Sequence, residues 1–357
     1  GAFVTKEYGF ARGFESFDDV HGLRAEEMFS NAINWVDSDA SDEKFFLFLH
    51  TFQPHDPYKK RQEVFEKEPY EPISDSEALE LFEKKFSDQN LTAQQKLDLF
   101  NYSFTSERIF GKVEPLNPFF AKLIQDTNNY SKKLLDNYLK MTTFYNSDAA
   151  KELSDFNDSL SFIVDSYDST LFDADIQFAK FIKKLEEKNL LDKTVIILLS
   201  DHGEAFMEHD SFFHARTIYN EEIHIPLIIK YPNNYHARVK ESVSLVDVSP
   251  TVLQSLKIDS PDSFHGMSLL NVLHGSKRGP IFSEKVGTTV IQDNWKLISQ
   301  DGLTEVYDLS KDPDEQENLA STNPEKLEEL QGILNAFVVF GKENSITPSE
   351  SSVVWDS

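Results

Sequence analysis

The residues best suited to chemistry are carboxylates and imidazoles that follow short apolar runs. Ser200-Asp201-His202-Gly203-Glu204 comes directly after the apolar run 195–199. In open α/β sheets, ligands bind at the carboxyl ends of strands. A carboxylate oxygen and an imidazole nitrogen there suit Mg, Ca, Mn or Zn, and two ligands do not decide among these metals. An Asp that precedes a Gly is also a common turn former, so a purely structural interpretation stays open.

Two further histidine segments occupy similar places. His214 follows Asp201 by thirteen residues of short polar sequence, which would bring a second imidazole back over the same pocket. His55 lies in a loop with two prolines beyond the apolar run 45–49, and the prolines would hold its ring toward the sheet edge. A surface histidine and a proline-braced turn are the structural alternatives. Imidazoles and a carboxylate around a cation would bind and polarise a tetrahedral oxyanion, but no Ser or Thr lies on a recognisable nucleophile elbow.

The elements that would position these residues alternate between strand and helix. The continuous apolar runs 44–50, 195–199 and 225–229 predict buried strands. The segment 173–188 has apolar residues at helical spacing and leads into the second of these runs, as in a crossover unit. The sequence therefore predicts an α/β sheet with both faces covered.

Two other regions differ in character. Between about residues 62 and 160 the pattern is polar and helical, which predicts a helical insertion without a cluster of candidate site residues; its stretches are 76–86, 92–100 and 117–144. Short segments after Gly275 predict a small antiparallel sheet, followed by a helix over 324–339; the segments are 280–282, 288–292, 295–299 and 305–309. We expect a domain over 1–275, a small C-terminal subdomain over 276–343 and a loose tail over 344–357.

The composition of the sequence argues against several classes of protein and kinds of site. The 357 residues include 61 acidic and 35 basic side chains, for a net charge of −26, which argues against binding to nucleic acid. The apolar runs are strand-sized, so no membrane span is expected. The absence of Cys excludes disulfides, thiolate metal sites and a Cys nucleophile within this sequence. The sequence opens Gly-Ala-Phe-Val, without Met or a signal peptide, and we expect it to be a piece of a longer protein.

Taken in order, the motifs resemble the sulfatase family of the alkaline-phosphatase superfamily. The similarity covers nearly the whole sequence apart from the insertion, and it includes the segments 7–19, 45–58, 167–175, 200–204, 208–214, 219–229, 246–251, 266–270, 295–298 and 307–319. It implies a mostly parallel sheet sandwiched by helices, with the helical insertion and the small C-terminal antiparallel subdomain.

The resemblance also implies roles for individual residues. Asp201 and His202 would be metal ligands. His55 and His214 would contact the sulfate group or protonate the leaving oxygen. Substrate contacts would include His50 and Arg216, with Lys6 as a substitute for a basic residue that the family usually has. His209 and His224 are interpreted as structural or rim residues.

The first part of the family pattern is not matched. It comprises the first strand with an Asp pair and the motif whose Cys or Ser becomes formylglycine, so we expect the formylglycine to lie in an N-terminal segment missing here. The whole protein would cleave sulfate esters with one divalent metal ion, Ca or Mg ahead of Mn or Zn. The chain as given would be inactive alone.

Three interpretations stay open at this point. The first is the sulfatase-like hydrolase, acting on a sulfated small molecule or glycan in the periplasm or outside the cell. The second is a phosphonate or phosphate ester hydrolase, or a phosphoethanolamine-type transferase, of the same superfamily. The third is a non-catalytic binding module that kept the fold. The C-terminal block from Tyr307-Asp308-Leu309 to Asn318-Leu319, which resembles the sulfatases, favours the first. Substrate identity and oligomeric state are not readable from the sequence.

Overall fold

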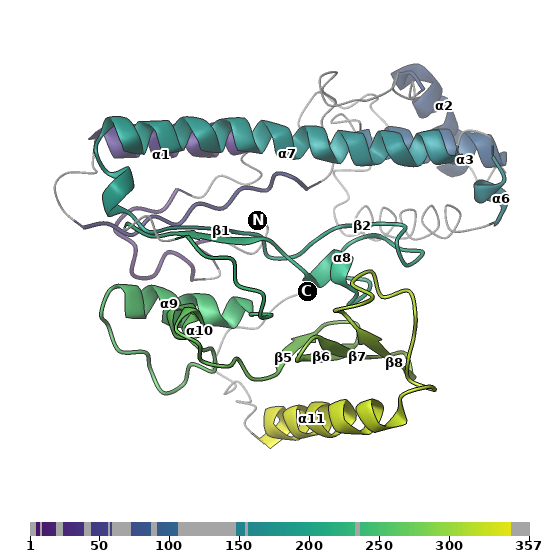
Figure 1. The fold of residues 1–357 in the computed structure, drawn as a ribbon. Coiled ribbons are helices and arrows are strands. Elements are labelled where there is room, and N and C mark those ends of the chain that lie inside the picture. The colour runs from purple at the N-terminus through teal and green to yellow at the C-terminus, as the bar shows by residue number, and fades with distance from the viewer. Residues whose placement is uncertain are drawn as a thin grey trace. The chain divides into compact units, whose positions relative to one another are not determined.

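The computed structural model describes residues 5–7, 9–18, 24–38, 44–55, 58, 73–86, 91–105, 148–153, 156–232 and 236–343. The chain forms two compact units, Gly1–Val195 and Ile196–Ser357 (Figure 1). The domain boundary expected near residue 275 falls inside the second unit and stays a prediction. The predicted tail 344–357 and the helical pattern 117–144 lie outside the described residues.

The first unit is built around two helices that lie side by side, α1 (Ala25–Ser38) and α7 (Phe156–Glu187) (Figure 1). One apolar stripe of α1 is buried at helical spacing: Ala25, Met28, Phe29, Ala32 and Val36. The Phe29 ring packs against Phe178 and Phe181 of α7, at centroid distances of 5.9 and 5.7 Å. The predicted helix over 173–188 is confirmed, but it is the second half of a longer helix.

Shorter helices complete this unit. They are α2 (Asp75–Phe86), α3 (Ala93–Thr105), α6 (Asp148–Lys151) and the 3-10 turn η1 (Leu191–Lys193). The helical character predicted for 76–86 and 92–100 is confirmed. Each of α2 and α3 begins after a residue whose side chain caps it: the Ser74 hydroxyl accepts a hydrogen bond from the Glu77 amide, and the Thr92 hydroxyl from the Gln95 amide.

The buried strand predicted over 44–50 is wrong for the described part of the chain. This segment has no ladder partner there, and its burial alternates along the chain. Phe46 and Phe48 are 61% and 53% exposed, whereas Phe45 turns inward and meets the Trp35 ring edge-on at 5.4 Å. The continuous apolar run misled the prediction, because aromatic residues also fill the outer positions of a segment that buries one face only.

The second unit begins with a two-stranded ribbon. Strands β1 (Ile196–Leu199) and β4 (Leu227–Lys230) confirm the strands predicted over 195–199 and 225–229. They pair antiparallel, from Ile196↔Lys230 to Leu199↔Leu227, so the parallel pairing expected of this sheet does not occur between them. The connection over residues 200–226 explains the difference by its content rather than its length. It contains the short strands β2 (Ala205–Phe206) and β3 (Phe212–Phe213) and a four-residue helix, but no crossover helix of the kind that usually joins parallel strands.

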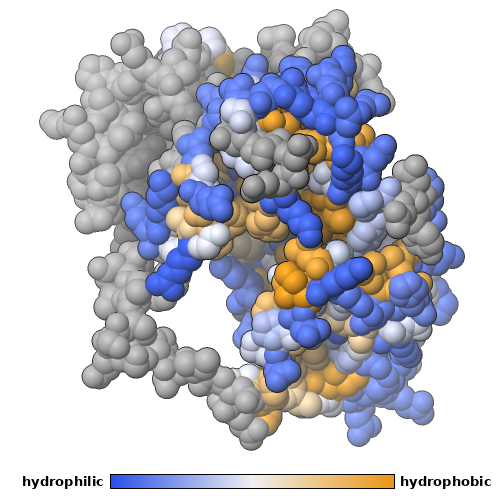
Figure 2. Space-filling model, turned by 90° about the vertical axis from the view of Figure 1, so that its left-hand side faces the viewer, coloured by the Kyte–Doolittle hydropathy of each residue, from blue (hydrophilic) through white to orange (hydrophobic). Residues whose placement is uncertain are grey.

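Burial of this ribbon is also lower than predicted. Leu198, Leu199 and Ile228 are 40%, 37% and 60% exposed, so the described residues do not cover both of its faces. Figure 2 shows hydrophobic residues reaching the surface among hydrophilic ones. No helix of the described residues has the length and the apolar character needed to span a membrane.

The C-terminal antiparallel sheet is confirmed. Its strands follow the order β5 (Ile281–Glu284), β6 (Thr288–Gln292), β7 (Trp295–Gln300) and β8 (Leu303–Asp308), each paired with the next. Helix α11 (Pro324–Glu343) packs on one face of it (Figure 1). The shared core consists of Val290, Leu297, Val306, Leu330 and Leu334. Because strand residues alternate between faces, Lys296 and Ile298 point to the opposite side from Leu297.

Between β4 and this sheet lie η2 (Leu245–Asp247), α9 (Val248–Ser255) and α10 (Leu269–Leu273). The fully buried Asp247 carboxylate ties them together. It accepts hydrogen bonds from the amides of Ser244 and Met267, at 2.9 and 2.8 Å, and from Nε of Arg278 at 3.0 Å. A buried carboxylate is tolerated here because each oxygen has a donor and a positive charge is adjacent.

Candidate active site

Asp201 and His202 directly follow β1, as the sequence predicts. The Asp201 side chain is 71% exposed, and its Oδ1 lies 3.8 Å from Nε2 of His202. Nδ1 of His202 lies 2.7 Å from the carbonyl oxygen of Gly203. Since a carbonyl only accepts, this contact places the ring proton on Nδ1 and leaves Nε2 as an electron-pair donor. The two donors that suit a cation therefore lie on the same side of this turn.

His214 returns to the same place through a short hairpin. Strands β2 (Ala205–Phe206) and β3 (Phe212–Phe213) pair Ala205 with Phe213, which brings the residue before β2 beside the residue after β3. His214 Nδ1 accordingly lies 3.1 Å from Oε1 of Glu204. Its ring stacks on the His202 ring, with centroids 4.0 Å apart. The sequence-based expectation that His214 and Asp201–His202 come together is met by this geometry.

The backbone around His214 is strained. Phe213 and Ala215, on either side of it, have φ angles of 71° and 61°. This left-handed conformation costs a side-chain-bearing residue on the order of 1 kcal/mol. Such strain clusters where a side chain must be held for function. Here it turns the chain out of β3 so that the imidazole faces His202.

Arg216 and Thr217 are held by a buried carboxylate that the sequence analysis did not single out. Glu222, 3% exposed, lies in helix α8 (Asn220–Ile223). It accepts hydrogen bonds from the Arg216 amide at 3.2 Å and from the Thr217 amide and hydroxyl at 2.9 and 2.8 Å. The Arg216 guanidinium lies over the Phe213 ring, 5.6 Å from its centroid. Burial lowers the pKa of Arg216, against the opposing effect of the Glu222 charge.

Gly203 packs directly against α8. Its amide donates to the Glu222 carbonyl at 2.7 Å, and a Cβ at this position would lie 2.0 Å from the Glu221 carbonyl oxygen. A carbon atom needs more than 3 Å of separation from such an oxygen, so only glycine fits this contact. The turn that carries Asp201 and His202 is therefore seated on the backbone of α8.

The donor set fits a divalent cation in part. Asp201 and His202 offer one carboxylate and one imidazole, which suit Ca, Mg, Mn or Zn. Among the described residues there is no group of three or more His, Cys, Asp or Glu side chains that could hold a metal ion. The described chain thus offers two candidate ligands at this place, fewer than a complete coordination sphere needs.

The remaining predicted site residues belong to the first unit. His55 is half-buried, and its ring stacks on Phe52 at 4.3 Å. His50 stacks on Phe48 at 6.4 Å, and Lys6 is exposed with Nζ 6.0 Å from the Phe17 centroid. The loop that contains His50 and His55 is held by the buried side chain of Gln53. This side chain accepts a hydrogen bond from the Ala25 amide at 3.0 Å and donates one to the Thr170 carbonyl at 3.2 Å, which connects the loop to α1 and α7. The roles of these three residues stay predictions.

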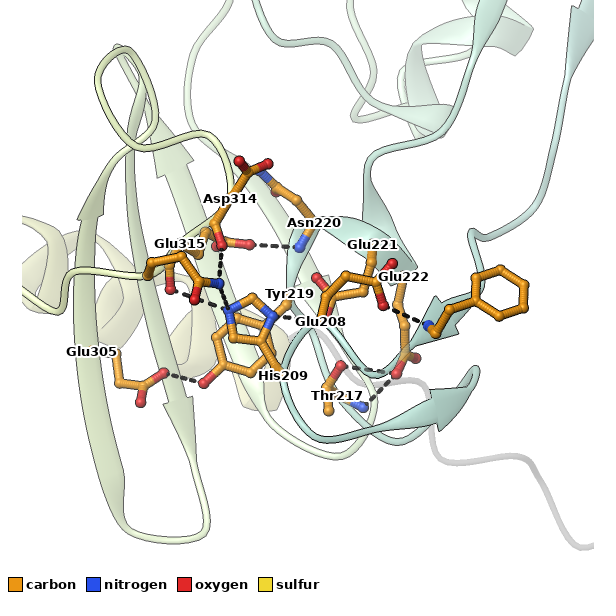
Figure 3. Close-up of polar contacts among 12 residues, drawn as sticks. Glu208, His209, Thr217, Tyr219, Asn220, Glu221, Glu222, Glu305, Asp314 and Glu315 are labelled. Atoms are coloured by element: carbon orange, nitrogen blue, oxygen red, sulfur yellow. Dashed lines mark hydrogen bonds and ion pairs between the residues drawn. The ribbon is translucent and has the colours of Figure 1, made fainter. Parts of the chain in front are cut away.

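A polar network surrounds the other end of α8 (Figure 3). His209 stacks on Tyr219 with centroids 3.7 Å apart, and its ring nitrogens lie 2.8 Å from Oε1 of Glu221 and 3.1 Å from the Glu315 carbonyl. Burial acts to lower the pKa of His209, but these two acceptors raise it, and the net shift is upward. Tyr219 donates its hydroxyl to Glu305 at 2.7 Å, and burial with this negative charge raises the pKa of Tyr219. The structural interpretation of His209 agrees with these contacts.

Glu204, Glu222 and Glu315 lie within the motifs 200–204, 219–229 and 307–319, but the sequence predicts no role for them. The sequence does not single out the partner Lys296 either: in Trp295-Lys296-Leu297-Ile298 it lies on the strand face opposite Trp295 and Leu297, and only the fold shows that this face is buried too, where an unpaired ammonium would be costly. Such a lysine requires a buried carboxylate elsewhere in the chain. The sequence does not say which of the 61 acidic residues supplies it.

Comparisons with known proteins identify the family of the chain. The family model described as Sulfatase matches residues 7–258, and the one described as N-sulphoglucosamine sulphohydrolase, C-terminal, matches residues 207–337. Arylsulfatase K of Gallus gallus is 34% identical over 195 residues, which are 48% of this chain and 36% of that protein. Arylsulfatase K of Homo sapiens is 33% identical over 192 residues, with the same shares of 48% and 36%. The matched part thus spans about a third of these relatives.

Solved structures share the fold. BT4656 in complex with its substrate D-glucosamine-2-N,6-O-disulfate aligns with a TM-score of 0.59 at 20% identity, over 93% of this chain and 72% of that one. The phosphonate monoester hydrolase SpPMH from Silicibacter pomeroyi aligns with a TM-score of 0.56 at 16% identity, over 95% and 68%. The alkaline-phosphatase-like α/β fold expected from the sequence is confirmed. Since the Sulfatase model covers more than half of its length, this chain belongs to the sulfatase family.

Proposed function

We propose that the protein containing this chain hydrolyses sulfate esters, and that this chain supplies two of its metal ligands and part of its oxyanion site. The observation that carries the proposal is the cluster of Asp201, His202 and His214 directly beyond β1, in a chain of the sulfatase family. Ligands of open α/β sheets bind at this end of the strands.

Each side chain has a stated task. Asp201 Oδ1 and His202 Nε2 hold one divalent cation, Ca or Mg ahead of Mn or Zn, with Gly203 fixing the tautomer of His202. A bound cation stabilises negative charge on the sulfate oxygens. His214, held by Glu204, contacts the sulfate group or protonates the leaving oxygen. His55 shares that task, and Arg216, His50 and Lys6 bind substrate.

We further propose that this chain alone does not turn over a sulfate ester. It contains no Cys, and no Ser stands in a Ser-x-Pro-x-Arg motif, so no residue of this sequence is a candidate for formylglycine. The hydrolysis requires a nucleophile in addition to the residues described here. Binding of a cation and of an oxyanion is what we expect the chain to do alone.

The substrate that we propose is a sulfated small molecule or glycan. The support is the sulfated sugar bound to BT4656 and the names of the arylsulfatase K relatives, since these proteins share the fold or the family. The net charge of −26 opposes long-range attraction of a polyanion. Recognition must then depend on short-range contacts, to which the half-buried Arg216 contributes a positive charge.

A second candidate is hydrolysis of a phosphonate or phosphate ester. The similarity to the phosphonate monoester hydrolase favours it, because that structure aligns over 95% of this chain with nearly the same TM-score as the sugar disulfate complex. Sulfate and phosphonate esters both present a tetrahedral oxyanion to a cation. The fold therefore does not separate the two reactions.

The experiment begins with the reading frame upstream of Gly1. The polypeptide that the whole frame encodes is assayed with para-nitrophenyl sulfate and with a para-nitrophenyl phosphonate monoester, beside its Asp201→Ala and His202→Ala variants and beside this chain alone. We expect sulfate ester hydrolysis that both substitutions reduce by at least ~100-fold, and no turnover by this chain. Hydrolysis of the phosphonate ester only would establish the second candidate. Turnover of the sulfate ester by this chain alone would refute the proposed need for a further nucleophile.

A further inference from the structure

A buried ion pair lies in the C-terminal part of the second unit, away from the residues given tasks above. Lys296 Nζ lies 2.6 Å from Oε1 of Glu315, and both side chains are 0% exposed. Burial lowers the pKa of Lys296 and raises the pKa of Glu315, so each charge depends on the other. A buried pair of this kind stabilises a fold poorly compared with apolar residues of similar size. Stabilisation of the fold therefore does not explain why this ion pair is buried here, and another role must be sought.

Both members of the pair bind the first residue of α8. Glu315 Oε2 accepts a hydrogen bond from the Asn220 amide at 2.6 Å, and Lys296 Nζ donates to Oδ1 of Asn220 at 3.2 Å. The Asn220 side chain also donates to the Pro313 carbonyl at 3.0 Å. Figure 3 shows Asn220 and Glu315 facing each other, with His209 and Tyr219 beside them. Three polar groups of Asn220 are thus fixed by β7 and by the loop after β8.

Helix α8 in turn holds both loops of the candidate site. Its Glu222 carbonyl accepts the Gly203 amide, and the Gly203 carbonyl fixes Nδ1 of His202. The Glu222 carboxylate holds the backbone of Arg216 and Thr217. Lys296 is therefore connected to the ring of His202 through its hydrogen bond to Asn220, the backbone of α8 from Asn220 to Glu222, and the two hydrogen bonds of Gly203. The Glu222 carboxylate connects the same helix to the backbone of Arg216.

We propose that Lys296 and Glu315 are positioning residues for the site: through Asn220 and α8 they set the placement of the His202 ring and of the Arg216 loop. This inference rests on the proposed function for the task of His202, but the placement itself can be measured without metal or substrate. A mobile α8 would leave Asp201 and His202 without the support that a cation site needs, because outer contacts of ligands govern metal affinity.

The test uses three variants and one matched control of this chain. Lys296→Met removes the ammonium, Glu315→Gln keeps an acceptor for the Asn220 amide without the charge, and Lys296→Met/Glu315→Leu replaces the pair by apolar groups. Lys277→Met is the control, because Lys277 is 75% exposed and pairs with Asp293 at 3.0 Å on the surface. Hydrogen exchange of the amides is followed for 200–206 and, as an internal reference, for α11, which packs on the opposite face of β7.

We expect the amides of 200–206 to exchange at least ~10-fold faster in Lys296→Met and in the double variant, while α11 keeps its wild-type exchange. Glu315→Gln should lie between these variants and the wild type. We expect the double variant to unfold at the wild-type temperature, so that faster exchange in it reports on the placement of the loop and not on stability. If Lys296→Met does not fold, the double variant is used in its place. Wild-type exchange over 200–206 in the double variant would overturn the inference.

Calorimetry with Ca²⁺, Mg²⁺ and Mn²⁺ separates this inference from the proposed function. If the wild type and Lys277→Met bind a cation, we expect the double variant to bind it ~10- to 100-fold more weakly. Wild-type affinity in the double variant overturns the inference and leaves the proposed metal site standing. If the wild type binds none of the three ions, the metal assignment fails, and the exchange measurement alone decides whether the pair positions the loops.

Discussion

Gly203→Ala tests the contact that seats the Asp201–His202 turn on α8. The added Cβ would lie 2.0 Å from the Glu221 carbonyl oxygen and 3.0 Å from its carbonyl carbon. Both atoms belong to the backbone, so no side chain can rotate away to make room. The turn and α8 must instead move apart by about 1.4 Å, from 2.0 Å to the 3.4 Å at which ordinary contacts begin.

Two costs follow from this movement. Overpacking of this kind costs about 1–3 kcal/mol. The Gly203 amide also loses its 2.7 Å bond to the Glu222 carbonyl, for about 1 kcal/mol more. A total of about 2–4 kcal/mol lowers the unfolding temperature of a unit of this size by roughly 5–15 °C. Because the turn is displaced, the distance between Oδ1 of Asp201 and Nε2 of His202 changes as well. The affinity for a cation should therefore fall together with the stability.

The assay is thermal unfolding followed by circular dichroism, with cation binding followed by calorimetry on the same samples. Gly279→Ala is the matched control, since nothing lies within 4 Å of the added Cβ and its φ is not positive. We expect the control to stay within about 0.5 kcal/mol of the wild type. If Gly203→Ala unfolds within 1–2 °C of that control, the close packing of Gly203 on α8 is not a real constraint and the reasoning fails.

Two further predictions concern the rest of the second unit. Leu297→Ala, in the sheet–α11 core at 0% exposure, should cost about 2–5 kcal/mol in denaturant unfolding, whereas Leu303→Ala, at 67% exposure on the next strand, should be nearly neutral; equal effects would contradict the assigned faces. Burial acts to lower the pKa of His209, which stacks on Tyr219, but Glu221 and the Glu315 carbonyl raise it, and its net shift in the folded chain is upward. Protonated His209 therefore stabilises the fold below its unfolded pKa of about 6.5, and this stabilisation is lost as the pH rises through the folded pKa. The stability of the wild type relative to His209→Gln should therefore be greatest near pH 5.5 and shrink by pH 8, and a difference that grows with pH would contradict the shift.

The C-terminal sheet was predictable because its signals are local. The apolar spacing of 288–292 and 295–299 with Asp293-Asn294 between them is typical of a tight hairpin, and both Asp293 and Asn294 adopt positive φ angles of 52° and 65°. The helix beginning at Pro324 likewise starts with a residue that suits a first turn. Such elements need no information from distant parts of the chain.

Long-range features were predicted less well. The run 44–50 and the pairing of β1 with β4 depend on which segment lies alongside, and composition does not encode that partner. In the candidate site, the return of His214 to His202 followed from a short spacing. The residues that hold the site in place could not be predicted in this way, because Glu222 and Glu315 differ from other acidic residues only in being buried by the fold.

Cation binding by this chain tests the central claim most directly. Calorimetric titration with Ca²⁺ and Mg²⁺ is made on the wild type, on Asp201→Ala and on His202→Ala. Asp210→Asn is the control: Asp210 is an acidic residue of the neighbouring β2–β3 hairpin, and asparagine tolerates its positive φ of 51°. We expect weak binding of one cation, with an affinity that falls at least ~10-fold in Asp201→Ala and in His202→Ala and stays unchanged in the control. Equal affinity in all four folded proteins would contradict the assignment of Asp201 and His202 as metal ligands.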